Sequence, residues 1–181
     1  EGNVVLWHKK RKHKPKTKQM VKLGMAVGSL AIFHEKLCVG TEQNIFLVRL
    51  ESLHVVQEWK GHSQLVTGLQ QVGDEMWSIS ADGTVRVWEE QWSESLFTLT
   101  AHTSKVLSIT RSSNYVWTGS FDKTINIWDV DTKLLVQEIT EEHQDTIRSM
   151  ITVNNVVWTG CGELDGHIRL WKSATSQPVQ L

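Results

Sequence analysis

The sequence predicts an all-β fold, a β-propeller assembled from repeated units of about forty residues. The segments 78–90, 118–130 and 159–173 resemble one another, and the last has two extra residues in its turn. A His, an Asp and a Trp recur at fixed spacings in these units. Short β-branched and aromatic runs bounded by Gly, Asp, Asn or Ser indicate strands, and no segment shows a sustained helical period. Four short strands in each unit is the pattern of a propeller blade.

The predicted units follow one another along the chain. Residues 1–23 form the last two strands of a preceding blade, with a basic inter-strand loop at 8–18. A degenerate blade is expected at 24–60, and regular blades at 61–100, 101–141 and 142–181. We therefore expect four near-complete blades plus two strands of another, which is a partial propeller. Such a segment would be the C-terminal part of a larger multidomain signalling or trafficking protein.

The segment 116–129, VWTGSFDKTINIWD, together with the Ala-His at 101–102, resembles the Gly-His to Trp-Asp pattern of the WD-repeat family. The resemblance covers nearly the whole chain. It implies that a His, a strand Ser or Thr, a turn Asp and a Trp form a hydrogen-bonded network inside each blade. The residues at these positions are His62, Ser78, Asp82 and Trp88; His102, Thr118, Asp122 and Trp128; and His143, Thr159, Asp165 and Trp171. A covered Asp needs such partners, and an imidazole, a hydroxyl and turn amides supply them.

The degenerate blade lacks this polar pattern. Leu23 stands at the His position, Val39 at the hydroxyl position and Gln43 at the Asp position, while Val48 lies about where the Trp belongs. We expect apolar packing alone to hold this blade together.

The same residue types occur in hydrolytic triads, so catalysis must be considered. A nucleophile needs one strained and exposed geometry, whereas this pattern occurs in three copies tied to the repeat. The pattern provides no second His on the same strand for a metal, and Cys38 and Cys161 form no Cys-x-x-Cys pair. The Gly-rich segment 160–166 precedes a strand, whereas a phosphate loop precedes a helix. We therefore predict no catalysis, metal or cofactor in this segment, although a further part of the parent protein could be catalytic.

Another aromatic register comprises Trp77, Trp117 and Trp158, each directly before the network hydroxyl, with Cys38 at the matching place. Alternation along a strand points these side chains away from the hydroxyl face. Packing between blades is the expected role, and a ligand contact is the alternative.

Function is then expected on the surface of the scaffold. The resemblance places partner contacts on the turns that join second to third strands and on the starts of the first strands. The side chains at those positions are Leu65, Thr67, Ala81, Lys105, Leu107, Phe121, Thr146, Arg148 and Leu164. Phe121 is the leading candidate for an anchor, because aromatic and Arg residues dominate binding hot spots. A Phe half-covered by the neighbouring blade is the structural alternative.

The second candidate surface is the basic run. The segment 9–18 carries no acid and seven cations, Lys9, Lys10, Arg11, Lys12, Lys14, Lys16 and Lys18. A solvated loop, a nuclear-import signal, an anionic membrane patch and a nucleic-acid contact all fit such a run. No aromatic residue lies among the lysines, which disfavours nucleic acid. Trp92, on a similar connection, is either a second contact point or a packing residue.

Two functions therefore remain open. The first is a non-catalytic scaffold for other proteins within a signalling or trafficking regulator, where the missing catalytic part could be a kinase, a GTPase regulator or a lipid phosphatase. The second is recruitment to anionic lipid or nucleic acid through residues 9–18. The sequence has no apolar run of membrane-spanning length. We expect a cytoplasmic location, with the membrane surface and the nucleus as alternatives.

Overall fold

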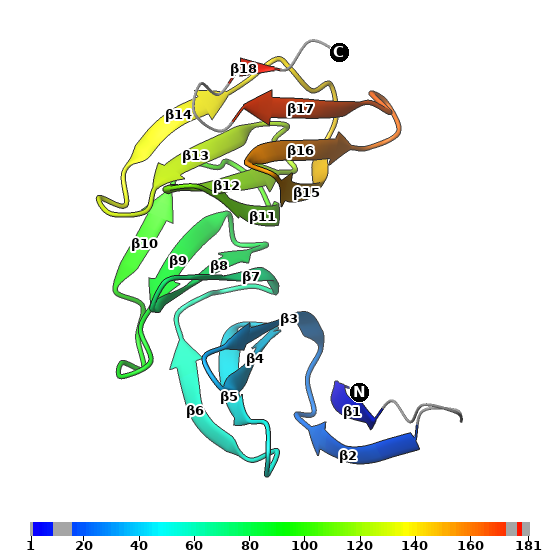
Figure 1. Ribbon diagram of the computed structural model, residues 1–181, viewed down its shortest axis with the longest axis vertical. Helices are drawn as coiled ribbons and strands as arrows, with labels where there is room; N and C mark the ends of the chain where they lie inside the picture. Colours follow the sequence, from blue (N-terminus) through cyan, green and yellow to red (C-terminus); the bar gives the residue numbers. More distant parts are fainter. Residues whose placement is uncertain (1, 9–15, 173–176, 179–181) are drawn as a thin grey trace.

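The computed structural model describes residues 2–8, 16–172 and 177–178 of the chain. Within these ranges the secondary structure is entirely β, with four four-stranded sheets and one hairpin. The hairpin consists of β1 (Asn3–His8) and β2 (Lys16–Lys22). The sheets form an arc that does not close into a ring, with the hairpin at one end and the last sheet at the other (Figure 1). The predicted all-β partial propeller is thus confirmed.

Each four-stranded sheet is called a blade here and numbered in chain order. Blade 1 contains β3 (Val27–Phe33), β4 (Lys36–Thr41), β5 (Asn44–Arg49) and β6 (Val55–Lys60). Blade 2 contains β7 (Val66–Val72), β8 (Glu75–Ser80), β9 (Thr84–Trp88) and β10 (Phe97–Thr100). Blade 3 contains β11 (Val106–Ser112), β12 (Tyr115–Ser120), β13 (Ile125–Asp129) and β14 (Leu135–Ile139). Blade 4 contains β15 (Ile147–Val153), β16 (Val156–Cys161), β17 (Ile168–Lys172) and β18 (Gln177–Pro178).

Every blade is an antiparallel meander whose strands pair in sequence order. Its first strand carries a register shift at the same place, between Val27 and Ser29, Val66 and Gly68, Val106 and Ser108, or Ile147 and Ser149. Such bulges bend a strand and increase its twist. Their repetition in β3, β7, β11 and β15 gives the four sheets a common shape, so they fan around one axis (Figure 1).

The first strands line the inside of the arc and are joined by side-chain hydrogen bonds. Ser29 Oγ donates to the carbonyl of Val66 at 2.9 Å, and Thr67 Oγ1 donates to the carbonyl of Val106 at 2.5 Å. A hydroxyl of one blade thereby satisfies a backbone carbonyl of the next blade near the bulge. These bonds fix the spacing of neighbouring blades at the centre, where the turns that carry candidate contacts converge.

The apolar core lies between adjacent sheets. Trp59 of β6 stacks on Trp88 of β9, with ring centroids 5.6 Å apart and an interplanar angle of 6°. Trp77 and Trp117 are fully buried between their own blade and the next one. Trp158 is 38% exposed, because no sheet among the described residues covers the outer face of blade 4. The Trp register thus packs between blades wherever a following blade is described.

Blade 1 has an apolar cluster where the other blades have the polar network. Val39 and Val48 are fully buried, and Leu23 packs against them. Val4 of β1 and Val21 of β2 complete this cluster, so the hairpin covers one face of blade 1. A buried His or Asp here would lack partners. Leu23, Val39 and Val48 are accordingly apolar, and Gln43, at the Asp position, is exposed.

Candidate functional site

The network in blade 3 is a continuous chain of hydrogen bonds, and its His lies in the segment before β11. The Nε2 atom of His102 lies 2.9 Å from Thr118 Oγ1, and its Nδ1 atom lies 3.1 Å from Asp122 Oδ2. The indole N–H of Trp128 donates to Thr118 Oγ1 at 2.9 Å. A neutral His102 with its proton on Nδ1 donates to Asp122 and accepts from Thr118, which in turn accepts from the indole. Every member therefore has a partner.

Blades 2 and 4 repeat this chain. His62 lies 2.7 Å from Ser78 and 2.9 Å from Asp82, and Trp88 donates to Ser78 at 2.8 Å. His143 lies 2.8 Å from Thr159 and 3.0 Å from Asp165, and Trp171 donates to Thr159 at 3.0 Å. The structure thus brings together all twelve side chains that the repeat pattern grouped in fours.

The electrostatics of the network favour a charged Asp beside a neutral His. Burial alone would raise the pKa of Asp82 and of Asp122, but hydrogen bonds from the paired imidazole and from the Thr two residues later hold both values below the usual range. Burial lowers the pKa of His62, against the opposing effect of the Asp82 carboxylate. The three imidazoles are at most 1% exposed. A substrate has no access to them, so the arrangement holds the blade together and is unsuited to catalysis.

The predicted partner face is built by backbone hydrogen bonds that pin each turn to the start of the first strand. The amide of Ala81 donates to the carbonyl of Leu65 at 2.9 Å, and the amide of Phe121 donates to that of Lys105 at 2.8 Å. Residues 16 apart in the sequence therefore become neighbours in each blade. These pairs create a surface of turn residues along one side of the arc, which we call the turn face and define by the nine candidate residues.

The nine residues differ in exposure. Phe121 is 54% exposed and Leu164 is 79% exposed, and Lys105 and Arg148 are also exposed. The residues of intermediate exposure are Leu65, Thr67, Ala81 and Leu107. Thr146 is only 3% exposed, which corrects its assignment as a contact residue. Its amide and carbonyl bond to Asp145 and Gly162, respectively, so it anchors the turn of blade 4 and offers no side-chain surface.

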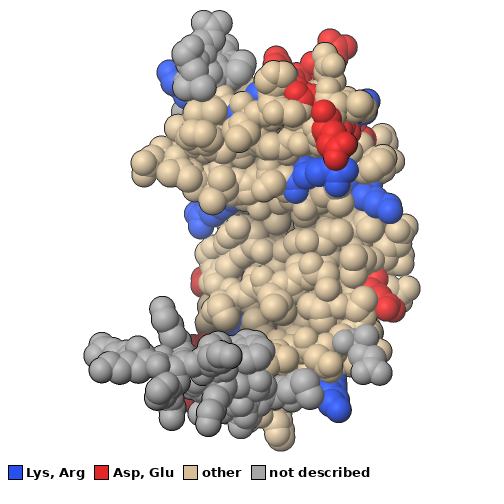
Figure 2. Space-filling model, turned by 90° about the vertical axis from the view of Figure 1, so that its right-hand side faces the viewer, with Lys and Arg blue, Asp and Glu red and all other residues tan. Residues whose placement is uncertain are grey.

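The inside of the arc also carries a shallow cavity of about 350 Å³ lined by the first strands. Three turn-face residues, Thr67, Leu107 and Arg148, take part in its lining. The surface seen from this open side consists mostly of uncharged residues, with Lys and Arg side chains in the middle and Asp and Glu near the upper end (Figure 2). The turn face therefore combines the exposed apolar side chains of Phe121 and Leu164 with the exposed cations Lys105 and Arg148.

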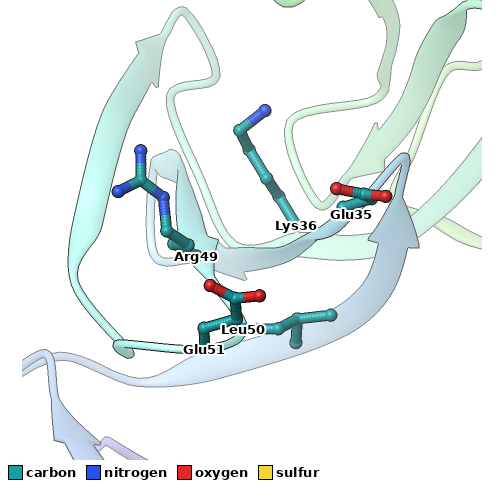
Figure 3. A pocket seen from close by; sticks show the side chains of 5 residues that line it. All are labelled: Glu35, Lys36, Arg49, Leu50 and Glu51. Carbon is teal, nitrogen blue, oxygen red and sulfur yellow. The ribbon is translucent and has the colours of Figure 1, made fainter.

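The side opposite the turn face carries charges of both signs. A cavity of about 400 Å³ between the β3–β4 and β5–β6 turns has both signs of charge in its wall, from Glu35, Lys36, Arg49 and Glu51 (Figure 3). Lys36 Nζ lies 2.5 Å from Glu90 of blade 2. Trp92 is 53% exposed in the connection before β10. Neither feature presents a set of unpaired like charges that would select an ionic ligand.

The basic run falls largely outside the described residues. Lys9, Lys10, Arg11, Lys12 and Lys14 lie outside them, and so do the side chains of Lys16 and Lys18, although their backbone belongs to β2. In the described ranges no helix has the length and apolar character required to cross a membrane.

Comparisons with known proteins agree with this architecture. The family model "WD domain, G-beta repeat" matches residues 53–89 and 93–129. A "Probable serine/threonine-protein kinase pats1" of Dictyostelium discoideum is 35% identical over 77 residues, which is 42% of this chain. The match spans 2% of the length of that relative.

Solved structures extend the likeness to almost the whole chain. The WD40 β-propeller domain of Doa1 is 25% identical, with a TM-score of 0.79, over 99% of this chain and 61% of that one. The computationally designed Ika4 protein is 28% identical, with a TM-score of 0.73, over 81% of this chain and 91% of that one. A chain of the mitotic checkpoint complex is 22% identical, with a TM-score of 0.82, over 92% of this chain and 53% of that one, and shows the fold alone.

Proposed function

Because this chain belongs to the WD-repeat family, we propose that it is a non-catalytic scaffold that binds a protein partner through the turn face. The observation that carries this proposal is the exposure of Phe121 and Leu164 on turns that the backbone holds rigidly. An exposed aromatic or apolar group on a fixed turn binds without a large loss of conformational freedom. WD40 propellers generally bind other proteins, and their fold is generally non-catalytic.

The turn that carries Leu164 is held by specific contacts. Asp145 accepts from the amides of Thr146 at 2.7 Å and Leu164 at 3.2 Å. A Cβ atom at Gly162 would clash with the Asp145 carboxylate, so a larger residue there would force Asp145 to move from its present contacts. The two extra residues of this turn are therefore ordered around Asp145, and Leu164 projects from an otherwise anchored loop. This supports a binding role for Leu164.

The cellular context belongs to the same proposal. We propose that the scaffold acts within a signalling or trafficking regulator in the cytoplasm. The relative from Dictyostelium discoideum is named a probable serine/threonine-protein kinase, which supports a signalling context. Recruitment through residues 9–18 to anionic lipid remains the alternative, and it rests on the seven cations of that segment.

Matched variants in a binding assay test the proposal. Partners that copurify with the chain are identified by mass spectrometry, and their affinities for purified variants are then measured by calorimetry. Phe121→Ala should weaken the binding free energy of the main partner by about 2 kcal/mol or more, since it removes a central aromatic anchor. Trp92→Ala is the matched control, because Trp92 is equally exposed but lies on the opposite side.

Charge reversal of residues 9–12 to Glu separates the two functions. If the turn face binds the partner, the reversal leaves the affinity nearly unchanged. The proposal would be contradicted if binding of a partner or of anionic liposomes is lost on the charge reversal but retained in Phe121→Ala. Such electrostatic binding would also weaken steeply as the salt concentration rises.

A further inference from the structure

The turn of blade 4 differs from those of blades 2 and 3 at two positions next to the network Asp. Cys161 pairs with Ile147 at the end of β16, where Ser80 and Ser120 pair with Val66 and Val106. His167 follows Asp165 by two residues, where Thr84 and Thr124 follow their own Asp. Two hydroxyl groups that bond to the network Asp in blades 2 and 3 are thus replaced by a thiol and an imidazole, which are both metal-binding groups.

These replacements gather three ligand-type side chains, His143, Cys161 and His167, around the Asp165 carboxylate. The ligand atoms of His143, Cys161 and Asp165 all lie within 4.8 Å of one another. His167 Nδ1 lies 2.6 Å from Asp165 Oδ1. His143 and Asp165 are almost fully covered, whereas the His167 side chain is 73% exposed and can turn. Two ligands are therefore fixed inside the blade, and the exposed His167 side chain leaves a path by which an ion can enter from solvent.

We propose that this cluster is a binding site for a divalent metal ion of borderline softness, Zn²⁺ above all, with His143, Cys161, Asp165 and His167 as its ligands. Thiolate, imidazole and carboxylate are the ligands that Zn²⁺ takes, usually four of them in tetrahedral sites. Binding would release the thiol proton of Cys161 to solvent. Four protein ligands leave no open position, so the ion would act structurally.

The second nitrogen of His143 supports this assignment. Its Nε2 atom is 2.8 Å from Thr159 Oγ1, which leaves Nδ1 facing Asp165. Metal-bound imidazoles usually have their other ring nitrogen held by a hydrogen bond, which fixes the ring orientation. The network that stabilises the blade thus already provides this outer support.

The guanidinium group of Arg169 lies at the position proposed for the metal ion. Arg169 Nη1 lies 2.8 Å from His143 Nδ1 and 2.7 Å from Asp165 Oδ2. In blade 2 the matching Arg86 bonds instead to Ser95, outside the network. Metal binding would therefore displace the Arg169 guanidinium toward solvent, where its side chain is already 25% exposed. The ion and the Arg169 guanidinium therefore compete for one site. Which of them is bound determines how strongly the turn that carries Leu164 is held in place.

Cobalt spectroscopy of the untagged 181-residue chain tests the site. Equimolar Co²⁺ should give the visible bands of a tetrahedral ion and a thiolate-to-cobalt charge-transfer band in the near ultraviolet, and Zn²⁺ should displace both. Cys161→Ser should abolish the charge-transfer band. His167→Thr should weaken binding by at least roughly tenfold, a loss that even outer partners of a metal cause. Arg169→Gln should tighten binding.

The substituted chains should keep the fold of the unmodified chain. Cys161→Ser and His167→Thr install the residues that blades 2 and 3 carry at these positions, and far-ultraviolet circular dichroism checks that the sheets are intact. Cys38→Ala is the matched thiol control, because Cys38 is buried in blade 1, and it should leave the band unchanged. No charge-transfer band in the unmodified chain, or an equal band in Cys161→Ser, would overturn the proposal.

Discussion

Lys133 in the connection before β14 reaches into blade 2, where its Nζ atom lies 2.5 Å from Glu75 Oε2. The ammonium also lies 5.4 Å from the centre of the Trp77 ring, and Trp77 donates to Glu75. Lys133 is only 8% exposed, which is unusual for a lysine. This pair is therefore an inter-blade clamp at the outer side of the arc, opposite the hydroxyl bonds on its inside.

Removal of one partner of this clamp should destabilise the chain. Glu75→Gln leaves the covered ammonium with a weaker partner, so the free energy of unfolding should fall by about 2 kcal/mol. The pair formed by Lys60 and Glu58 is the control, because Lys60 is 68% exposed. Glu58→Gln should change stability by less than about 1 kcal/mol. Urea denaturation measures both, and equal effects would contradict a clamp.

The polar network should matter in the regular blades and be dispensable in blade 1. Asp122→Ala removes the acceptor of His102, Thr103 and Thr124, and it should cost about 1–3 kcal/mol of unfolding free energy. Gln43 stands at the matching position of blade 1 and makes one exposed bond at 3.4 Å. Gln43→Ala should be nearly neutral. Similar losses for both variants in denaturant unfolding would refute a special role for the network Asp.

Stability should decline on acidification in two stages. The pKa of His62 is lowered in the folded chain, so below about pH 6.5 the unfolded state binds more protons than the folded state. The pKa values of Asp82 and Asp122 are also lowered, so their stabilisation is present above about pH 4 and is lost progressively below it.

Urea midpoints measured from pH 8 to pH 3 in the presence of a chelator check this dependence. The double variant Asp82→Asn and Asp122→Asn should start less stable and show a shallower decline below about pH 4. A midpoint that rises as the pH falls from 7 to 5 would show that the sign is wrong.

The repeated features could be predicted from the sequence, because the fold uses the same residue types at the same spacing several times. A His that precedes a hydroxyl by 16 residues fixes which strands meet, and Asp82 and Asp122 then fall in the turn beside it. A shift of one residue would turn the alternating side chains to the wrong face, so the pattern also specifies register.

Features that occur once could not be predicted in this way. Lys133 and Glu75 are 58 residues apart, and the equivalent contact between blades 1 and 2 uses the opposite charges, Lys36 with Glu90, so no shared residue pattern marks it. The proposed metal cluster rests on Cys161 and His167, which depart from the pattern shared by the blades, whereas the expectation of no metal site rested on that pattern. Thr146 makes the same backbone bond to its turn as Leu65 and Lys105 make in blades 2 and 3, but its side chain is only 3% exposed. The repeat pattern specifies this backbone bond and not the exposure of the side chain beside it.

The outer face of blade 4 should make the chain self-associate. Ile151, Trp158 and Ile168 lie on one face of the sheet, because Ile151 pairs with Trp158, and Gly160, two residues further along the same strand, pairs with Ile168. They are 60%, 38% and 67% exposed, and no other sheet among the described residues covers them. A contiguous apolar face of this kind promotes association in water. The double variant Ile151→Lys and Ile168→Glu should therefore shift the chain toward monomer in analytical ultracentrifugation, with little change in melting temperature. Leu164→Ser is the control, because Leu164 is 79% exposed but lies on the turn face, and it should leave association unchanged. A monodisperse monomer in the unmodified chain would contradict the prediction.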